Sequence, residues 1–409
     1  MKKCKNNITI IRSYARISII IIIAFAIVLA TTSCCFDLSK LMESKSEKIT
    51  FTFDPENNTF ETDKIDTDGT GIQFENKNID YTEIKEELSD PSGFEITNDE
   101  EEEFFSNLEK IYPEDKFILA SQYLKSFKGL YPSGYFTLIK VTQVHDYSLG
   151  YGWFELFESN SILGYEDFNS VYGSDIAVIT HEMTHSGSGP FISNFVSDLT
   201  DFYFWQDYSF LIGNKSVLVE RDRTFFSKYE LFDDIIDPDH FDRTYLEPQG
   251  PIEVEGQQIE VGEVDFTNLL DELNAYAVSA KCAVATEQYA GYESSSGERF
   301  GLLKQMSHLE LYLQKLNEKY PDDWDYLAGN DGFSFLIMKL WYEAEKMESA
   351  IKDDTRFNMN GDKVADFVYD PVNYGIIEKL FDESGVIDYK NIGFDEINGQ
   401  FENISVYDI

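Results

Sequence analysis

Two of the chain's five histidines, His181 and His185, stand four residues apart with Glu182 between them. The segment 174–187 has the features of one short helix: capping residues at its start, apolar residues in its first turns and a glycine at its end. Because four residues make about one helical turn, both imidazoles then lie on the same face. The fold must therefore hold this helix so that its two histidines face a common point.

Two imidazoles on one helical face can bind a single metal ion. Glu182 is rotated about 100° from His181 around the helix axis, so its carboxylate lies off the ligand direction but within reach of a water molecule on the metal. Zinc lowers the pKa of such a water to about 7, and a glutamate there can take its proton and return it to a leaving amine. The pattern predicts peptide hydrolysis, with His181 and His185 as zinc ligands and Glu182 as the general base.

The stretch 181–185, His-Glu-Met-Thr-His, resembles the HExxH helix of the zincin metallopeptidases, and Val178 and Ile179 match the apolar lead-in of that family. The resemblance implies an α+β fold of two lobes. A small sheet and the active-site helix would form the upper lobe over residues 98–189, and residues 190–409 would form a mostly helical lower lobe. The peptide would lie extended along a strand edge, for which residues 152–158 are a candidate.

A third ligand is needed, and the metzincin branch would place glycine at 188 and histidine at 191. The chain has Ser188 and Phe191 there, which excludes that branch and leaves a carboxylate. Residues 269–277 predict a helix with Glu272 on its inward face and Asp271 facing outward. A glutamate far downstream of the histidines is similar to the gluzincin arrangement, in which Glu272 would be the third ligand.

Other ligands stay open as alternatives. Glu287 shares a helical face with Glu272, and His240 could bind the metal or assist. Asp198 and Asp201 follow the histidine helix at a distance that resembles the aspzincins, although the accompanying motif of that group is absent. The alternative role for Glu272 is structural: a carboxylate in the first turns of a helix, where the helix dipole favours negative charge.

Two tyrosines are candidates for a hydrogen bond to the oxyanion that forms during hydrolysis, a role that zincins often give to tyrosine or histidine. Tyr276 shares a helical face with Glu272 and is the candidate catalytic residue, with Tyr245 as the second choice. Because the chain has 25 tyrosines, packing in the core is the alternative role for both.

A second motif, residues 358–367, carries oxygen-bearing side chains at alternate positions and resembles a calcium-binding loop. Asn358 stands where such loops have an aspartate, and Lys363 where they have a glycine. The favoured interpretation is a hairpin that turns at Asn360 and Gly361, with calcium as the alternative.

Residues 1–33 have the features of an export signal. Five basic residues precede an uncharged stretch from Ile17 to Ser33, and small residues then lead directly to Cys34. This resembles a bacterial lipoprotein signal with Cys34 as the lipidated residue; a single-span anchor and simple secretion are the alternatives. Residues 34–97 predict an acidic tether with a short strand at 49–53.

The remaining pattern predicts a mixed fold. Apolar periodicity predicts helices at 99–111, 117–127, 302–316 and 333–344, and buried strands at 135–144 and 152–158. With 43% hydrophobic residues the chain can bury a large core. Its 33 basic and 75 acidic residues give a net charge of −42, which would repel nucleic acids.

The sequence therefore predicts an exported, membrane-anchored zinc peptidase of gluzincin type, whose partners are a peptide or protein substrate and the membrane. One alternative is a catalytically silent surface lipoprotein that uses a zincin-like scaffold to bind a partner. A purely structural acidic surface protein is the other.

Overall fold

The computed structural model separates the chain into two units of contacting residues, Met1–Lys77 with Val254–Gln257, and Asn78–Glu253 with Gln258–Ile409. The residues that the structure describes are 51–54, 59–62, 79–111, 114–144, 175–191, 207–220, 223, 225–248, 252–254, 257–259, 265–287, 298–358, 361–386, 388–397, 400–401 and 403–408.

In the first unit, the described residues form a hairpin of β1 (Phe51–Asp54) and β2 (Thr59–Thr62), with Phe51 opposite Thr62. The strand predicted at 49–53 coincides with β1 over residues 51–53, and residues 49 and 50 lie outside the described residues. The predicted signal segment 1–33 and Cys34 lie outside the described residues. Within the described part of the chain, no helix is both long and apolar enough to cross a membrane.

The second unit opens with helices. The helices predicted at 99–111 and 117–127 are present as α3 and α4, whereas the first helix, α2, lies within the segment interpreted as a tether. The elements in order are α2 (Thr82–Leu88), α3 (Asn98–Ile111), α4 (Glu114–Leu130) and α5 (Pro132–Val144).

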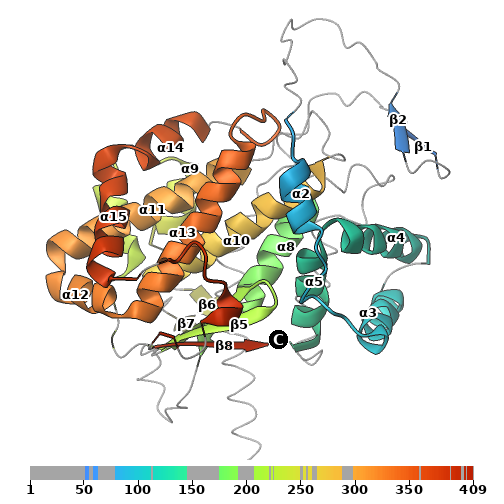
Figure 1. The fold of residues 1–409 in the computed structure, drawn as a ribbon, viewed down its shortest axis with the longest axis horizontal. Helices are drawn as coiled ribbons and strands as arrows, with labels where there is room; N and C mark the ends of the chain where they lie inside the picture. Colours follow the sequence, from blue (N-terminus) through green and yellow to red (C-terminus); the bar gives the residue numbers. More distant parts are fainter. Residues whose placement is uncertain are drawn as a thin grey trace, which may run out of the picture. The chain divides into compact units, whose positions relative to one another are not determined.

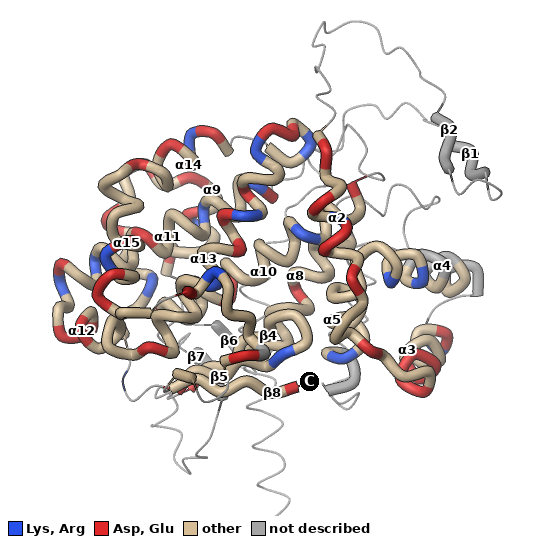
Figure 2. Tube along the Cα trace, in the orientation of Figure 1, with Lys and Arg blue, Asp and Glu red and all other residues tan. Residues whose placement is uncertain are grey.

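Residues 135–144 lie in helix α5, so the strand predicted there is wrong. The run is rich in β-branched and aromatic residues, but a short apolar run buried on most sides reads alike in a strand and in a helix. Pro132 at the first helical position favours the helix start. The mainly acidic α3 (Figure 2) then holds α5 in place, since Glu100 pairs with Lys140 at 2.6 Å and Glu101 accepts a hydrogen bond from Tyr135.

A four-stranded antiparallel sheet follows, in the order β3-β4-β5-β8. Its strands are β3 (Gly189–Phe191), β4 (Asp207–Ile212), β5 (Lys215–Glu220) and β8 (Ile404–Asp408). Val217 lies opposite Phe210 on one side and Val406 on the other, and all three are buried. Strands β6 (Ile252–Val254) and β7 (Gln257–Ile259) form a separate hairpin.

This four-stranded sheet begins at Gly189, whereas a small sheet was predicted within residues 98–189. Within that segment the described helices are α3, α4, α5 and a helix at 175–187, and residues 145–174 lie outside the described residues. The strand predicted at 152–158 lies outside the described residues. In β4 the side chains of Tyr208 and Phe210 are buried, and those of Asp207 and Ser209, which alternate with them, are partly exposed, as in a strand with one face on the core.

The rest of the unit is helical, and the helices predicted at 302–316 and 333–344 are confirmed. The elements are η4 (Lys228–Asp234, a 3-10 helix), α9 (His240–Leu246), α10 (Phe266–Ala285), α11 (Glu298–Lys319), α12 (Pro321–Gly329), α13 (Asp331–Ile351), α14 (Gly361–Val368), α15 (Pro371–Ser384) and η6 (Phe394–Glu396, also 3-10). The described chain is thus mostly helical with a small antiparallel sheet, which agrees with an α+β class.

Helix α10 lies at the centre of the unit. It packs on α8 (Asp175–Gly187), α11 and α13, and α8 in turn lies between α10 and α5 (Figure 1). One face of α8 is apolar: Ile176, Ile179 and Met183 are buried in one cluster with Leu138 and Ile139 of α5, to which α10 contributes Cys282 and Ala285. Apolar packing therefore fixes α8 between α5 and α10, and the opposite face of α8 carries the polar residues described below.

One carboxylate of the helical core lacks the usual compensation. Glu310 in α11 is fully buried, and neither of its carboxylate oxygens hydrogen-bonds to any residue in the described part of the chain. Burial, reinforced by the charges of Asp370 and Glu345, raises the pKa of Glu310 to about 9. Glu310 is therefore protonated at neutral pH in the folded chain.

Replacing Glu310 by glutamine should change how stability depends on pH. In the wild type the stability contributed by the protonated carboxyl is complete below the ordinary pKa of 4.5 and is lost as pH rises through about 9. The free energy of unfolding of Glu310→Gln, relative to wild type, should therefore increase by up to about 1.4 kcal/mol per pH unit across that window. Urea unfolding at pH 5, 6.5 and 8 measures it.

Glu318→Gln is the matched control, because Glu318 lies exposed on the same helix. Its stability relative to wild type, measured at the same three pH values, gives the effect of removing one exposed negative charge from the helix. A constant difference for Glu310→Gln would show that Glu310 ionises alike in the folded and unfolded chain.

Candidate metal centre

The site begins with helix α8, which spans Asp175–Gly187 as the sequence predicts. Its apolar residues face the core, which turns the histidine face toward α10. The rings of His181 and His185 lie edge to face with centroids 4.7 Å apart, and their Nε2 atoms are 3.0 Å from each other. The predicted one-turn spacing thus brings two nitrogen donors to one point.

Helix α10 places Glu272 at the same point. Its Oε2 atom lies 3.3 Å from Nε2 of His185 and 3.9 Å from Nε2 of His181. Among the described residues, these three form the one group of three or more histidine, cysteine or acidic side chains whose ligand atoms lie within 4.8 Å of one another. The structure therefore brings together the three residues that the sequence singled out as metal ligands.

The three side chains fit a metal ion by two tests. Ligands at about 2.0–2.2 Å from a tetrahedral zinc lie about 3.3–3.6 Å apart, close to the three distances here. Glu272 is buried, and its Oε2 atom accepts no well-formed hydrogen bond from the residues that the structure describes. A buried carboxylate oxygen without a donor is costly, and a cation would compensate it. Two imidazoles and one carboxylate form a donor set that suits zinc.

Asp271 corrects a prediction. It was expected to face outward, but it is buried, and its Oδ2 atom lies 2.9 Å from Nδ1 of His185. Tyr208 of β4 donates a second hydrogen bond to the same oxygen at 3.4 Å. The outward assignment failed because α10 is buried on nearly every side, so adjacent residues 100° apart both face protein.

Asp271 and Tyr208 are the functional candidates that sequence reasoning missed. A carboxylate bonded to the far nitrogen of a ligating histidine fixes the ring's orientation and tautomer. Apolar and small residues occur on all sides of helix α10, and Asp271–Asn274 are four consecutive buried residues in it. The lack of a polar face in this segment was the signal in the sequence that Asp271 is buried. Tyr208 had no such signal, because only the fold brings β4 next to α10.

The charges of the site are strongly coupled. Burial and the proximity of His185 lower the pKa of His181 to about 3, and His181 also hydrogen-bonds to the backbone of Ala275. For His185, burial would lower the pKa, but the charges of Glu272 and Asp271 outweigh it and raise the pKa. Glu272 has a lowered pKa because the two histidines outweigh its burial. Glu272 is therefore a carboxylate, as a metal ligand must be.

Glu182 lies beside this group and is partly buried. Burial raises its pKa to about 7; the charge of His185 opposes this shift, whereas Glu272 and Asp271 reinforce it. A carboxylate with a pKa near neutrality can both accept and release a proton under physiological conditions. The position and the pKa of Glu182 suit the general-base role that the sequence predicts.

Tyr276 lies next to His181, and Tyr245 lies next to Tyr276. The ring of Tyr276 stands edge to face with the ring of His181 at 4.7 Å between centroids, and its hydroxyl is hydrogen-bonded to the hydroxyl of Tyr245 at 2.8 Å. The charges of Glu272 and Glu182 act on both hydroxyls and, together with burial, raise their pKa values. Both tyrosines therefore present protonated hydroxyls near the site.

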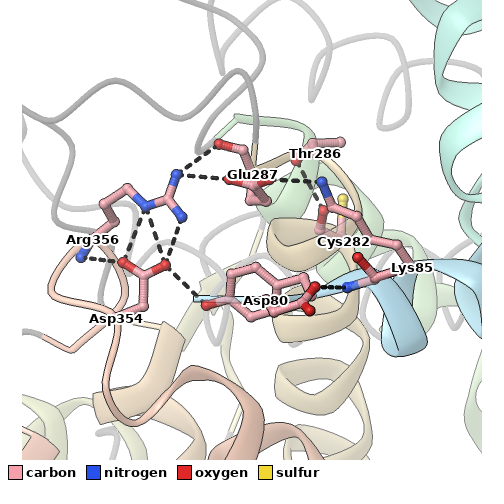
Figure 3. A network of polar contacts seen from close by, with 9 residues as sticks. Asp80, Lys85, Cys282, Thr286, Glu287, Asp354 and Arg356 are labelled. Carbon is pink, nitrogen blue, oxygen red and sulfur yellow. Dashed lines mark hydrogen bonds and ion pairs between the residues drawn. The ribbon is translucent and has the colours of Figure 1, made fainter. Parts of the chain in front are cut away.

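The alternative ligands are placed elsewhere. Glu287 lies just beyond the end of α10, about four turns from Glu272, where it accepts hydrogen bonds from Lys85 at 2.7 Å and Arg356 at 2.8 Å (Figure 3). His240 begins α9 and does not belong to the three-residue group. Asp198 and Asp201 lie outside the described residues.

The motif at 358–367 adopts a different structure from the one expected. Helix α14 begins at Gly361, so the predicted hairpin is wrong. Asn358 and Asp362 both accept hydrogen bonds from Nη1 of Arg299, a guanidinium that also binds Glu348. The oxygens that the sequence offered to calcium thus face an arginine cation of the protein itself.

Comparison of the chain with models of known protein families, with curated proteins and with solved structures finds no match. The geometry of the site is therefore the basis for the functional proposal.

The hydrogen bond between Asp271 and His185 predicts an effect on metal binding. Asp271→Asn should weaken zinc binding about tenfold or more, since loss of a carboxylate bonded to a ligating histidine costs 10- to 100-fold in affinity. Competition with a zinc chelator, followed by calorimetry, measures the change. Asp325→Asn, at an exposed position of α12, is the control and should bind zinc like the wild type. Equal affinity in both variants would contradict the orienting role.

Proposed function

We propose that the protein is a zinc-dependent peptidase in which His181, His185 and Glu272 bind the metal and Glu182 is the general base. The observation that carries this proposal is the convergence of two Nε2 atoms and one buried carboxylate oxygen from two packed helices. The HExxH spacing on α8 and the glutamate on a later helix resemble gluzincins. A gluzincin-like architecture, with two lobes on either side of the site, belongs to the proposal.

When bound, a zinc ion would supply the positive charge that makes a water molecule acidic near pH 7 and polarises a substrate carbonyl. Glu182 would accept the proton of the attacking water, because its raised pKa keeps it near the balance between the two protonation states. It would then give this proton to the amine that leaves when the peptide bond breaks. Asp271 would keep the ring of His185 in the orientation that points Nε2 at the metal.

Tyr276 is the candidate donor to the oxygen of the attacked carbonyl. Burial and the charge of Glu272 raise the pKa of its hydroxyl, so that the hydroxyl is protonated at neutral pH, and its ring lies against the ring of the proposed ligand His181. A donor fixed in advance at such a position stabilises the transition state more than the bound substrate. Tyr245 supports Tyr276 through the bond between the two hydroxyls.

The proposed setting is the extracytoplasmic side of a membrane. The basic start and the uncharged stretch up to Ser33 support export, and the small residues before Cys34 support lipid attachment there. Substrates would be peptides or proteins on that side of the membrane. The net charge of −42 argues against a nucleic-acid partner.

Glu182→Gln tests the mechanism. The variant should keep zinc at one ion per chain, because Glu182 is not a ligand, and should cleave peptides at least about 100-fold more slowly, since it cannot accept a proton. Metal analysis and a peptide-library cleavage assay on the detergent-solubilised chain measure both. Glu378→Gln, exposed on α15, should match the wild type.

Three outcomes would count against the proposal in different ways. An active Gln variant would remove Glu182 as the base, and a wild type that binds no zinc would remove the mechanism. Zinc bound without cleavage of any library peptide would favour the alternative of a silent binding module.

A further inference from the structure

The ring of Tyr276 packs against helix α11 at Gly301, where the absence of a side chain leaves room for it. A Cβ atom placed on Gly301 would lie 2.1 Å from Cε1 of Tyr276, 2.7 Å from Cδ1 and 2.9 Å from Cζ. Real Cβ atoms do not approach other atoms so closely, and the contacts fall on the body of the ring, which cannot bend away. The backbone of α11 at Gly301 is therefore a flat surface against which the Tyr276 ring lies.

Helix α9 encloses the same ring from another side. The ring of Phe241 lies 5.7 Å from that of Tyr276 and 4.4 Å from that of Tyr245, which gives Tyr276 its hydroxyl partner. Phe241 also contacts Phe300, the neighbour of Gly301, at 5.7 Å. With the His181 ring edge at 4.7 Å, Tyr276 has neighbours on several sides and little freedom to rotate.

The enclosure is itself anchored to α11. Asp242, next to Phe241, accepts hydrogen bonds from Lys304 at 2.7 Å and from His308 at 2.8 Å, and both donors lie on α11. Asp242 also closes a capping box with Asp239 at the start of α9. A helix of only seven residues is thereby held in place by buried charges, and it carries Phe241 and Tyr245 with it.

We infer that Gly301 is a positioning residue: together with Phe241, it sets the place of the Tyr276 ring beside His181 and with it the place of the Tyr276 hydroxyl. This inference rests on the proposed function for the catalytic importance of Tyr276. A displacement of about 1 Å at a reacting group can lower the rate about 100-fold. Any side chain at position 301 should therefore act on catalysis through Tyr276 without touching the metal ligands.

The experiment compares Gly301→Ala, Tyr276→Phe, the double variant and Gly375→Ala in the full chain. Gly375 is the matched control, because it lies within helix α15 and an added Cβ there meets nothing within 4 Å. Gly301→Ala should keep one zinc per chain and lower kcat about 100-fold, as Tyr276→Phe should, with KM little changed. The double variant should be no slower than the slower single variant, because both changes remove one contribution.

A second measurement does not depend on activity. In protein labelled with 3-fluorotyrosine, the ¹⁹F resonance that disappears in Tyr276→Phe identifies Tyr276. That resonance should shift in Gly301→Ala and stay in place in Gly375→Ala. Phe241→Leu, which leaves α11 unchanged, should shift it as well and serves if Gly301→Ala does not fold.

The outcomes separate this inference from the proposed function. An unmoved Tyr276 resonance in the Gly301 and Phe241 variants would overturn the inference, whatever the enzyme's activity. A shifted resonance with wild-type kcat in Gly301→Ala, where Tyr276→Phe is slow, would overturn it too, as would losses that multiply in the double variant. A wild type that neither binds zinc nor cleaves peptides would instead remove the proposed function, while the resonance would still decide whether Gly301 seats the ring.

Discussion

The packing of α8 between α5 and α10 is the interaction on which the site depends. Ile176, Ile179 and Met183 bury one face of α8 in an apolar cluster that includes residues of α5, and this packing sets the helix rotation that directs His181 and His185, on the opposite face, toward α10. Free energy for holding three polar groups at 3.0–3.9 Å from one another has to come from such packing, because the groups themselves lose hydration when buried. The metal centre thus lies on the face of α8 opposite its apolar cluster, in the contact with α10.

Around that centre, burial and neighbouring charges together set the protonation states of the histidines and of Glu182. Asp271 and Glu272 stabilise a proton on His185, whereas His181 stays neutral because burial and its neighbour act in the same direction. Burial raises the pKa of Glu182 to about 7, and the charges of Glu272 and Asp271 reinforce this shift against the opposing charge of His185. These shifts have one origin, the concentration of five ionisable side chains in a poorly hydrated space, and active sites are typical places for such concentrations.

The sequence predicted the local parts of this arrangement well and the long-range parts less well. One-turn spacing made the His181 and His185 pairing predictable, and helical periodicity around residue 272 made Glu272 an acceptable third partner. Asp271 was misassigned because α10 has no solvent face, a fact of packing that a local pattern does not contain. Residues 135–144 were misassigned because strand propensity favoured β structure there, while contacts with α3 and α8 imposed a helix. Tyr208 needed the sheet topology, which no local signal supplies.

The adjacent residues Asp271 and Glu272 contact the two different nitrogens of the same imidazole, Nδ1 and Nε2 of His185. Two adjacent residues of α10 thus contact the imidazole of His185 through both of its nitrogens. A slide or a rotation of α8 along α10 would have to break both contacts together, so the centre has no easy half-open form. These two contacts make positions 271 and 272 interdependent, since a shorter side chain at one position would move the His185 ring and so weaken its contact with the other residue. Natural variation at either position should therefore be constrained by its neighbour as well as by the metal.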